Sequence, residues 1–367
     1  MKTKIAAVVV IALCCIRDVY AQDEFKIRAA PLRVTHRSAV FKKILSEPIN
    51  DIITGPKFAV FKSNRKLWVK FPGRDITLLS ELVSLPNNFD WYEAVCIAED
   101  RVVASVGNYS EEQYLEEKDK TAGEFRGGSA AVGLLIVDLM LRTCRLIQDI
   151  RIVDRPSNTY AAPPDPNSSI PSFQSAYFDG KELYAGAYGY LYKLNLDSGE
   201  AWILQEDGLS DNRFWTFKES GAIWTTTDSG GDGASIRKTQ NKVSKDYYLL
   251  NNAYISPDRV IRFGKRLLTS SSAGIIEIDE LTKTYIHYQF SRDKEKMGVF
   301  KLSVLNGSLW GVRDDGIARF DLQRKSAIHY LMSADNKLVA ALALGVFDGK
   351  LYAGTENGLV IVDIAAR

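Results

Sequence analysis

Histidine is scarce in this sequence, with three histidines among 367 residues. Two of them, His287 and His329, occupy the same place in the similar segments YIHY and AIHY, so we expect them to have a structural role. His36 is then the one histidine left as a general base. The scarcity disfavours a lyase or metallohydrolase that depends on several histidines.

The sequence also lacks a polybasic tract and, after position 22, an apolar run as long as the roughly 20 residues of a membrane span. Residues 1–21 carry three of the 47 basic and one of the 45 acidic residues, so the remaining chain has no net formal charge. The sequence therefore has no basic patch that would attract a nucleic acid or an anionic membrane surface, and we expect no integral membrane span.

Residues 1–21 are typical of a secretory signal peptide. Two lysines precede an apolar run, Ile5–Ile16, and a small residue, Ala21, offers the cleavage site. We expect cleavage after Ala21 and a secreted or periplasmic protein. A lipoprotein anchored at Cys14 remains an alternative, although Leu13 is not the small residue expected before a lipid-attachment cysteine.

An apolar pair that follows a turn signal recurs along the chain. Most successive pairs are separated by roughly 40 residues, and the second interval is about twice as long. A repeat of about 42 residues that reads as four short strands predicts an all-β fold, a seven-bladed β-propeller of four-stranded antiparallel blades. The pairs are Leu67-Trp68, Val102-Val103, Leu183-Tyr184, Ile223-Trp224, Leu267-Leu268, Leu309-Trp310 and Leu351-Tyr352.

The chain ends do not each hold a complete repeat. The last unit stops near Asp363, after its third strand, whereas Ala39 to Leu45 has the phase of a fourth strand. We therefore expect residues 22–367 to form one domain in which this N-terminal strand completes the last blade and closes the ring. Residues 22–36 are expected to form a strand or arm that covers an edge.

Two long segments interrupt the repeat, 108–131 within the second unit and the proline-rich 155–172 after it. The first connects a second to a third strand and the second connects two blades, and both kinds of connection emerge on the same face. Long loops on a rigid scaffold commonly carry binding function.

These segments and two turns supply the candidate ligand contacts, because aromatic and arginine side chains are typical of recognition surfaces. A solvated flap is the alternative for segment 108–131, and water is the alternative partner of the two turn residues. The candidates are Tyr109, Tyr114, Arg126 and Tyr160 in the long segments, and Arg313 and Glu356 in second-to-third-strand turns.

The segment after Thr227 offers Asp228 and Asp232 among glycines, which is a weak calcium signal. It has no third acidic ligand, so a solvated connection between strands is the stronger interpretation. We expect no cofactor.

Cys96 and Cys144 fall on the first and the outermost strand of the second unit. Strands lie about 4.8 Å apart, which separates the two residues by some 10–14 Å and exceeds the limit of roughly 7 Å for a disulfide. We predict two buried free thiols.

The stretches LQEDGLSDNRFWTFKESGAIWTTT and FDGKLYAGTENGLVIVD resemble the two-component-regulator propeller repeat. Gly354-Thr355, Gly358-Leu359 and Asp363 match that pattern best, and the resemblance covers residues 173–367. In that family such repeats form sensing regions of larger receptors. No membrane helix or kinase follows here, so the resemblance does not imply signalling across a membrane.

These observations favour a secreted or periplasmic, non-enzymatic propeller that binds a protein, peptide or glycan. The alternative is a carbohydrate- or lactone-active hydrolase or lyase with carboxylates near the axis, with calcium as its one candidate metal.

Overall fold

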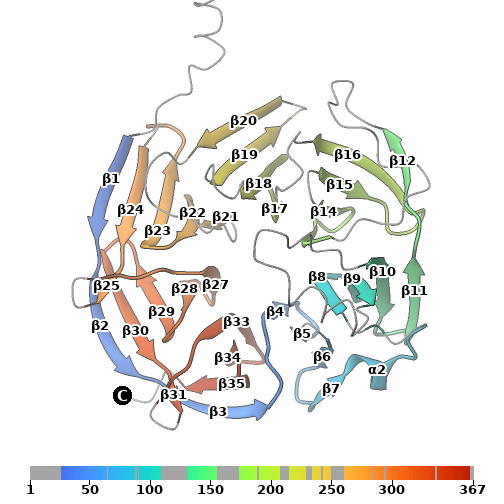
Figure 1. The fold of residues 1–367 in the computed structure, drawn as a ribbon, viewed down its shortest axis with the longest axis horizontal. Coiled ribbons are helices and arrows are strands. Elements are labelled where there is room, and N and C mark those ends of the chain that lie inside the picture. The colour runs from blue at the N-terminus through green and yellow to red at the C-terminus, as the bar shows by residue number, and fades with distance from the viewer. Residues whose placement is uncertain are drawn as a thin grey trace, which may run out of the picture.

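The protein folds into seven sheets of four or five strands, arranged radially around one axis (Figure 1). A computed structural model describes residues 26–363 with internal gaps. The all-β, seven-bladed propeller predicted from the repeat is confirmed. The residues left out of the description within that range are 64, 87–88, 90, 109–129, 155–172, 188–189, 207–214, 229–233, 241–242, 249–259, 283, 293–294 and 335–336.

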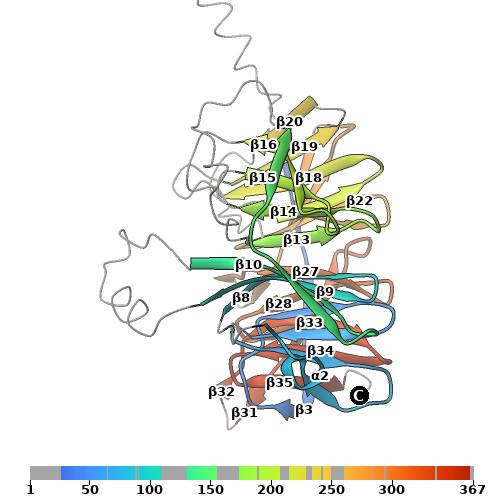
Figure 2. The same ribbon diagram turned by 90° about the vertical axis from the view of Figure 1, so that its right-hand side faces the viewer.

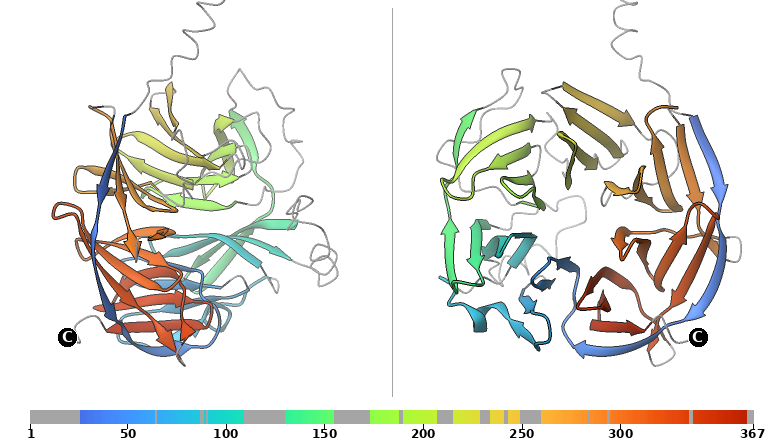
Figure 3. Two further views of the ribbon diagram at one scale, coloured as in Figure 1. Left: turned by 60° about the vertical axis from the view of Figure 1, so that its left-hand side comes forward. Right: turned by 180° about the vertical axis from the view of Figure 1, so that it is seen from behind.

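Each blade is numbered here in chain order, and its strands run from the axis outwards (Figures 1 and 3). Blades 1 to 3 consist of β4 (Asp51–Thr54), β5 (Ala59–Lys62), β6 (Leu67–Lys70) and β7 (Ile76–Leu78); β8 (Trp91–Ala98), β9 (Arg101–Asn108), β10 (Ala130–Asp138) and β11 (Thr143–Ile147); and β13 (Ser175–Phe178), β14 (Leu183–Ala187), β15 (Tyr190–Leu194) and β16 (Glu200–Glu206). Blades 4 and 5 consist of β17 (Trp215–Glu219), β18 (Ala222–Asp228), β19 (Ala234–Gln240) and β20 (Val243–Tyr248); and β21 (Val260–Phe263), β22 (Arg266–Ser271), β23 (Gly274–Asp279) and β24 (Thr284–Gln289). Blades 6 and 7 consist of β27 (Lys301–Leu305), β28 (Ser308–Arg313), β29 (Gly316–Asp321) and β30 (Ser326–Leu331); and β33 (Ala341–Phe347), β34 (Lys350–Thr355), β35 (Gly358–Asp363) and β3 (Val40–Leu45).

The short elements outside the blades lie in connections. A one-turn helix, α2 (Leu79–Leu82), follows β7, and two small hairpins pair β25 (Ser291–Arg292) with β26 (Glu295–Lys296) and β31 (Ser333–Ala334) with β32 (Lys337–Leu338). Within the part of the chain that the structure describes, no helix has the length and apolar character needed to cross a bilayer.

Local turn chemistry explains why the strands begin and end where they do. The first-to-second-strand hairpins of blades 4, 6 and 7 have positive φ at both central residues, for example 48° at Asn306 and 70° at Gly307. This backbone matches the twist of a two-residue hairpin and favours Asn-Gly and Asp-Gly. Third strands end in a side-chain-capped turn, as where Asp279 Oδ1 accepts bonds from the amides of Leu281 and Thr282 at 3.0 and 3.1 Å.

The N-terminal strand closes the ring, as predicted. β3 pairs antiparallel with β35 and becomes the outermost strand of blade 7. Blade 7 then packs on blade 1, where the rings of Phe61 and Tyr352 lie 5.3 Å apart in a shared core cluster. Because the strand that completes the last blade comes from the start of the chain, pairing between the two ends of the domain holds the ring closed.

The arm before β3 also forms strands, and these run along the outside of two further blades (Figure 3). β1 (Lys26–Pro31) pairs parallel with β24, and β2 (Arg33–Ser38) pairs parallel with β30. β12 (Arg151–Asp154) is added to β16 of blade 3 in the same parallel way. The prediction of an edge-covering arm is confirmed, and its parallel pairing is a new finding.

The predicted register was wrong in the first blade. Leu67-Trp68 lies on the third strand β6, whereas the second strand β5 carries Val60-Phe61, with Phe61 opposite Ile52. Phe61 precedes Val103 by one full repeat length, so the repeat is more regular than the sequence pattern indicated. The short Ser63–Lys66 turn before β6 produced the misleading signal, because it resembles the hairpin that precedes the other pairs.

The two cysteines lie on the strands predicted for them, and both thiols are free. Cys96 is buried, but Cys144 is only half-buried, so the prediction of two buried thiols was wrong for Cys144. Its outermost strand has a neighbouring strand on one side only, which leaves the Cys144 side chain partly open. Burial raises the pKa of the Cys96 thiol to about 12.

Candidate ligand-binding face

One face of the ring carries the second-to-third-strand turns and the blade-to-blade connections, and we call it the loop face. Figure 2 views the ring from its edge. The second strand of each blade ends beside the start of the first, as where Gly107 pairs with Trp91 and Gly186 with Ser175. The strand ends that flank segments 109–129 and 155–172 therefore lie on this face.

Most of the predicted contact residues fall outside the described residues. This applies to Tyr109, Tyr114, Arg126 and Tyr160, and also to Asp232 of the weak calcium signal. Asp228 is the last residue of β18. Among the described residues, no group of three His, Cys, Asp or Glu side chains could hold a metal ion.

Arg313 ends β28 in the second-to-third-strand turn of blade 6, but its side chain points into the protein and is 2% exposed. Its Nε donates to Asp315 Oδ1 at 3.1 Å, and its Nη1 donates to the carbonyl oxygen of Gly298. The guanidinium also lies over the ring of Phe290, 4.5 Å from the centroid. Arg313 therefore links blade 6 to the connection from blade 5 and does not face a ligand on the open surface.

Asp315 is the centre of a buried polar cluster. Besides Arg313, it contacts His329, whose Nε2 lies 3.0 Å from Asp315 Oδ1 and whose side chain is fully buried. Burial by itself would raise the pKa of Asp315, but the close contact with His329 and the charge of Arg313 lower it to about 2. The carboxylate is therefore ionised at neutral pH and acts as an acceptor only.

Glu356 occupies the equivalent turn of blade 7 and is exposed. The turn is rigid, since Thr355 Oγ1 donates to the carbonyl oxygen of Gly358 at 2.8 Å and accepts from the amide of Asn357 at 3.1 Å. Among the described residues no hydrogen-bond or ion-pair partner engages the Glu356 carboxylate, so this group is available to a ligand.

Asp51 lies on the innermost strand of blade 1. Its carboxylate is therefore a candidate for the carboxylates near the axis that the alternative hydrolase or lyase function would need. Its Oδ1 pairs at 2.5 Å with Nζ of Lys301 on the innermost strand of blade 6. Both side chains are largely buried, at 13% and 14% exposure, so the pair acts as a structural tie between two blades.

Sequence reasoning missed Asp315 and the contact between His36 and His329, whose Nδ1 atoms lie 3.1 Å apart. The signal was present in the Arg313-Asp314-Asp315 turn, because the positions one repeat length before and after Asp315 hold Ala273 and Asn357. An acidic residue in one repeat only, close to an arginine, indicates a local ion pair.

A comparison with protein families and with curated proteins finds no match. Solved structures do share the fold. The extracellular domain of BT3049 from B. thetaiotaomicron, named as a putative hybrid two-component system, aligns with a TM-score of 0.60 and 14% identity over 89% of this chain and 42% of that one. That of BT4673 from the same organism aligns with a TM-score of 0.60 and 12% identity over 88% of this chain and 39% of that one.

The WD40 propeller domain of Doa1 aligns with a TM-score of 0.54 and 13% identity over 89% of this chain and 96% of that one. The chain thus spans about two-fifths of the two extracellular domains it is similar to. The resemblance to two-component-regulator propellers predicted from the repeats is confirmed at the level of the fold.

Proposed function

We propose that this protein is a secreted or periplasmic, non-enzymatic β-propeller that binds a protein, peptide or glycan on its loop face. The observation that carries the proposal is the arrangement of this face. The strand ends that flank both long segments lie on it, and Glu356 projects from a rigid turn of the same face without a partner among the described residues. A rigid ring that presents loops on one side is a common arrangement for recognition.

The proposed location has two supports. The N-terminal residues are typical of a secretory signal peptide, and two similar solved structures are extracellular domains. Tyr109, Tyr114, Arg126 and Tyr160 are the aromatic and basic residues that we propose for ligand contact, together with Glu356.

The experiment is a binding screen of residues 22–367 against glycan and peptide arrays, with and without calcium. The two test variants are Tyr109→Ala combined with Tyr114→Ala, and Glu356→Gln. The control is Lys265→Gln, which removes an exposed charge from a hairpin on the opposite face. We expect the test variants to lose binding of any ligand found and the control to keep it.

Two results would contradict the proposal. Equal binding by the test variants and the control would remove the loop face as the site. Release of product from a bound glycan or lactone, lost when a carboxylate near the axis is replaced, would favour the hydrolase or lyase alternative.

A further inference from the structure

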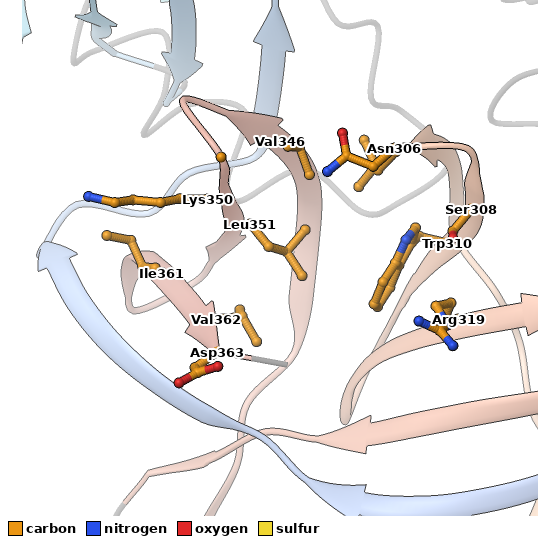
Figure 4. Close-up of a pocket in the computed structure, with 12 residues that line it drawn as sticks. Asn306, Ser308, Trp310, Arg319, Val346, Lys350, Leu351, Ile361, Val362 and Asp363 are labelled. Carbon is orange, nitrogen blue, oxygen red and sulfur yellow. The ribbon is translucent and has the colours of Figure 1, made fainter. Parts of the chain in front are cut away.

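A pocket of about 510 Å³ opens between blades 6 and 7 on the side opposite the loop face. This second face, which we call the hairpin face, carries the first-to-second-strand hairpins. Figure 4 shows Trp310 and Arg319 on one wall of the pocket and Leu351 and Val362 on the facing wall. The other lining residues are Leu305, Asn306, Ser308, Val346, Gly349, Lys350, Ile361 and Asp363.

The repeat allows this pocket to be compared with equivalent places in other blades. Arg319 lies on the third strand directly opposite Trp310. The equivalent residue in blade 3 is Lys193, opposite Tyr184, and it forms an ion pair with Glu182 at 3.0 Å. A charge at this third-strand position is thus neutralised within blade 3.

In blades 4 and 5 the charged residue at the same third-strand position also forms an ion pair. In blade 4, Lys238 pairs with Glu280 of the next blade at 3.0 Å. In blade 5, Glu277 pairs with Arg266 at 2.8 Å. Charges of either sign are therefore matched, and the matching residue comes either from the second strand or from the neighbouring blade.

Blade 6 breaks this pattern. The second-strand position that holds Glu182 in blade 3 and Arg266 in blade 5 holds the neutral Ser308. Arg319 is exposed and, within the described part of the chain, has no hydrogen-bond or ion-pair partner. In blade 7 the same second-strand position holds Lys350, and the third-strand residue opposite Tyr352 is the apolar Ile361. Figure 4 shows the Lys350 side chain extending away from Arg319, so Arg319 is the unpaired cation beside Trp310.

The contact between neighbouring blades differs at the same level. Lys218 of blade 4 pairs with Asp179 of blade 3, and Arg262 of blade 5 pairs with Glu219 of blade 4 at 2.6 Å. Between blades 6 and 7 the equivalent residues are Leu305 and Val346, which line the pocket. These two apolar residues cannot form an ion pair across the gap, so the crevice beside Arg319 has an apolar lining at this level.

We propose that this pocket binds a single carboxylate carried by an apolar group. Arg319 holds the carboxylate at the mouth, and Trp310, Leu351 and Val362 receive the apolar part. A guanidinium suits this role because it binds a carboxylate with two parallel hydrogen bonds. Asp363 at the edge disfavours a ligand with a second negative charge. A free aliphatic carboxylate and the C-terminal residue of a peptide both present this chemistry.

The test uses residues 22–367 and isothermal titration calorimetry with defined probes. Octanoate is compared with octanol, which lacks the charge. An acetylated tetrapeptide ending in leucine is compared with its amidated form. We expect octanoate to bind and octanol to bind at least tenfold more weakly, because a hydrogen bond to a charged group is worth about one factor of ten or more. Tighter binding by the free peptide than by octanoate identifies a peptide C-terminus as the preferred source.

The variants separate this site from the loop face. Arg319→Gln is expected to weaken octanoate binding about tenfold, and Arg319→Lys to recover part of it. Lys265→Gln, a cation in the equivalent hairpin of blade 5, and the loop-face variant Glu356→Gln are expected to leave it unchanged. The inference is overturned if octanol binds as well as octanoate, if Arg319→Gln keeps full affinity with an unchanged melting temperature, or if neither probe binds at millimolar concentration.

Discussion

The Nδ1 atoms of His36 and His329 lie 3.1 Å apart, and this contact joins the N-terminal arm to the buried cluster of blade 6. The Nε2 atom of the same His329 lies 3.0 Å from Oδ1 of Asp315. The buried imidazole of His329 therefore lies between His36 of the arm and the ionised carboxylate of Asp315, and it connects the two.

Replacing Asp315 should destabilise the protein strongly. Asp315→Ala leaves the guanidinium of Arg313 buried without its counter-charge, so we expect a loss of about 3–5 kcal/mol in unfolding free energy at pH 7. The exposed neighbour gives the matched control, since Asp314→Ala should change stability by less than about 0.5 kcal/mol. Urea unfolding followed by circular dichroism measures both, and equal effects would refute the ion pair.

The same carboxylate predicts part of the acid sensitivity. The pKa of Asp315 is lowered from 3.8 to about 2 in the folded protein. Its ionised form therefore contributes stability above the unfolded pKa, and this contribution is lost as the pH falls through the folded one. A shift of this size is worth about 2 kcal/mol. The difference in unfolding free energy between the wild type and Asp315→Asn should narrow by that amount from pH 5 to pH 2, and a constant difference would contradict the assignment.

The arm should contribute to global stability. Leu32 lies between β1 and β2, is 6% exposed and belongs to the core cluster of blades 5 and 6. We expect Leu32→Ala to cost about 2–5 kcal/mol, as for other buried leucines. Val40, at the start of the strand β3 that follows the arm, is 59% exposed, so Val40→Ala should cost less than about 0.5 kcal/mol. Thermal unfolding of both variants tests this, and a silent Leu32→Ala would show that the arm is dispensable.

Gly316 is one of several glycines whose replacement should be costly. Its φ is +144°, and an added Cβ would lie 2.1 Å from the carbonyl oxygen of Tyr330 on the adjacent strand. Gly316→Ala must shift that strand, and we expect a cost of about 2–4 kcal/mol. Gly307 has open space around it, so Gly307→Asn should cost less than about 1 kcal/mol. Comparable melting temperatures for the two variants would contradict the close approach.

The two thiols should differ in reactivity. Cys96 is fully buried with a raised pKa, whereas Cys144 is half-buried and its Sγ donates to the carbonyl oxygen of Ser84 at 3.1 Å. Because the thiolate is the reactive form, iodoacetamide should label Cys144 slowly and Cys96 only after unfolding. Mass spectrometry of labelled peptides gives the order. Labelling of Cys96 first, or a disulfide between the two, would refute the strand assignment.

Much of the fold could be predicted from the sequence because it depends on local chemistry. Asn306-Gly307 and Asp348-Gly349 fix hairpins through their positive φ angles, and the regular spacing of apolar pairs fixes the blades. The phase of Ala39 to Leu45, which matches that of a fourth strand, indicated the ring closure, since an exposed edge needs a partner. The parallel pairing of β1 with β24 and of β2 with β30 could not be predicted. No local sequence signal distinguishes an arm that only covers a sheet edge from an arm that hydrogen-bonds to that edge as an extra strand.

Two arginines of blade 6 mark the limit of what the sequence alone determined. It placed Arg313 at the end of a second strand and Arg319 on the third strand, but it did not determine which of them faces solvent. Arg313 is buried because the connection from blade 5 presents Phe290 and the Gly298 carbonyl to it. Arg319 stays unpaired among the described residues because its own blade offers the neutral Ser308 and the facing wall of blade 7 offers Leu351 and Val362. The partner of a charge belongs to a neighbouring blade or strand, so only the tertiary structure decided it.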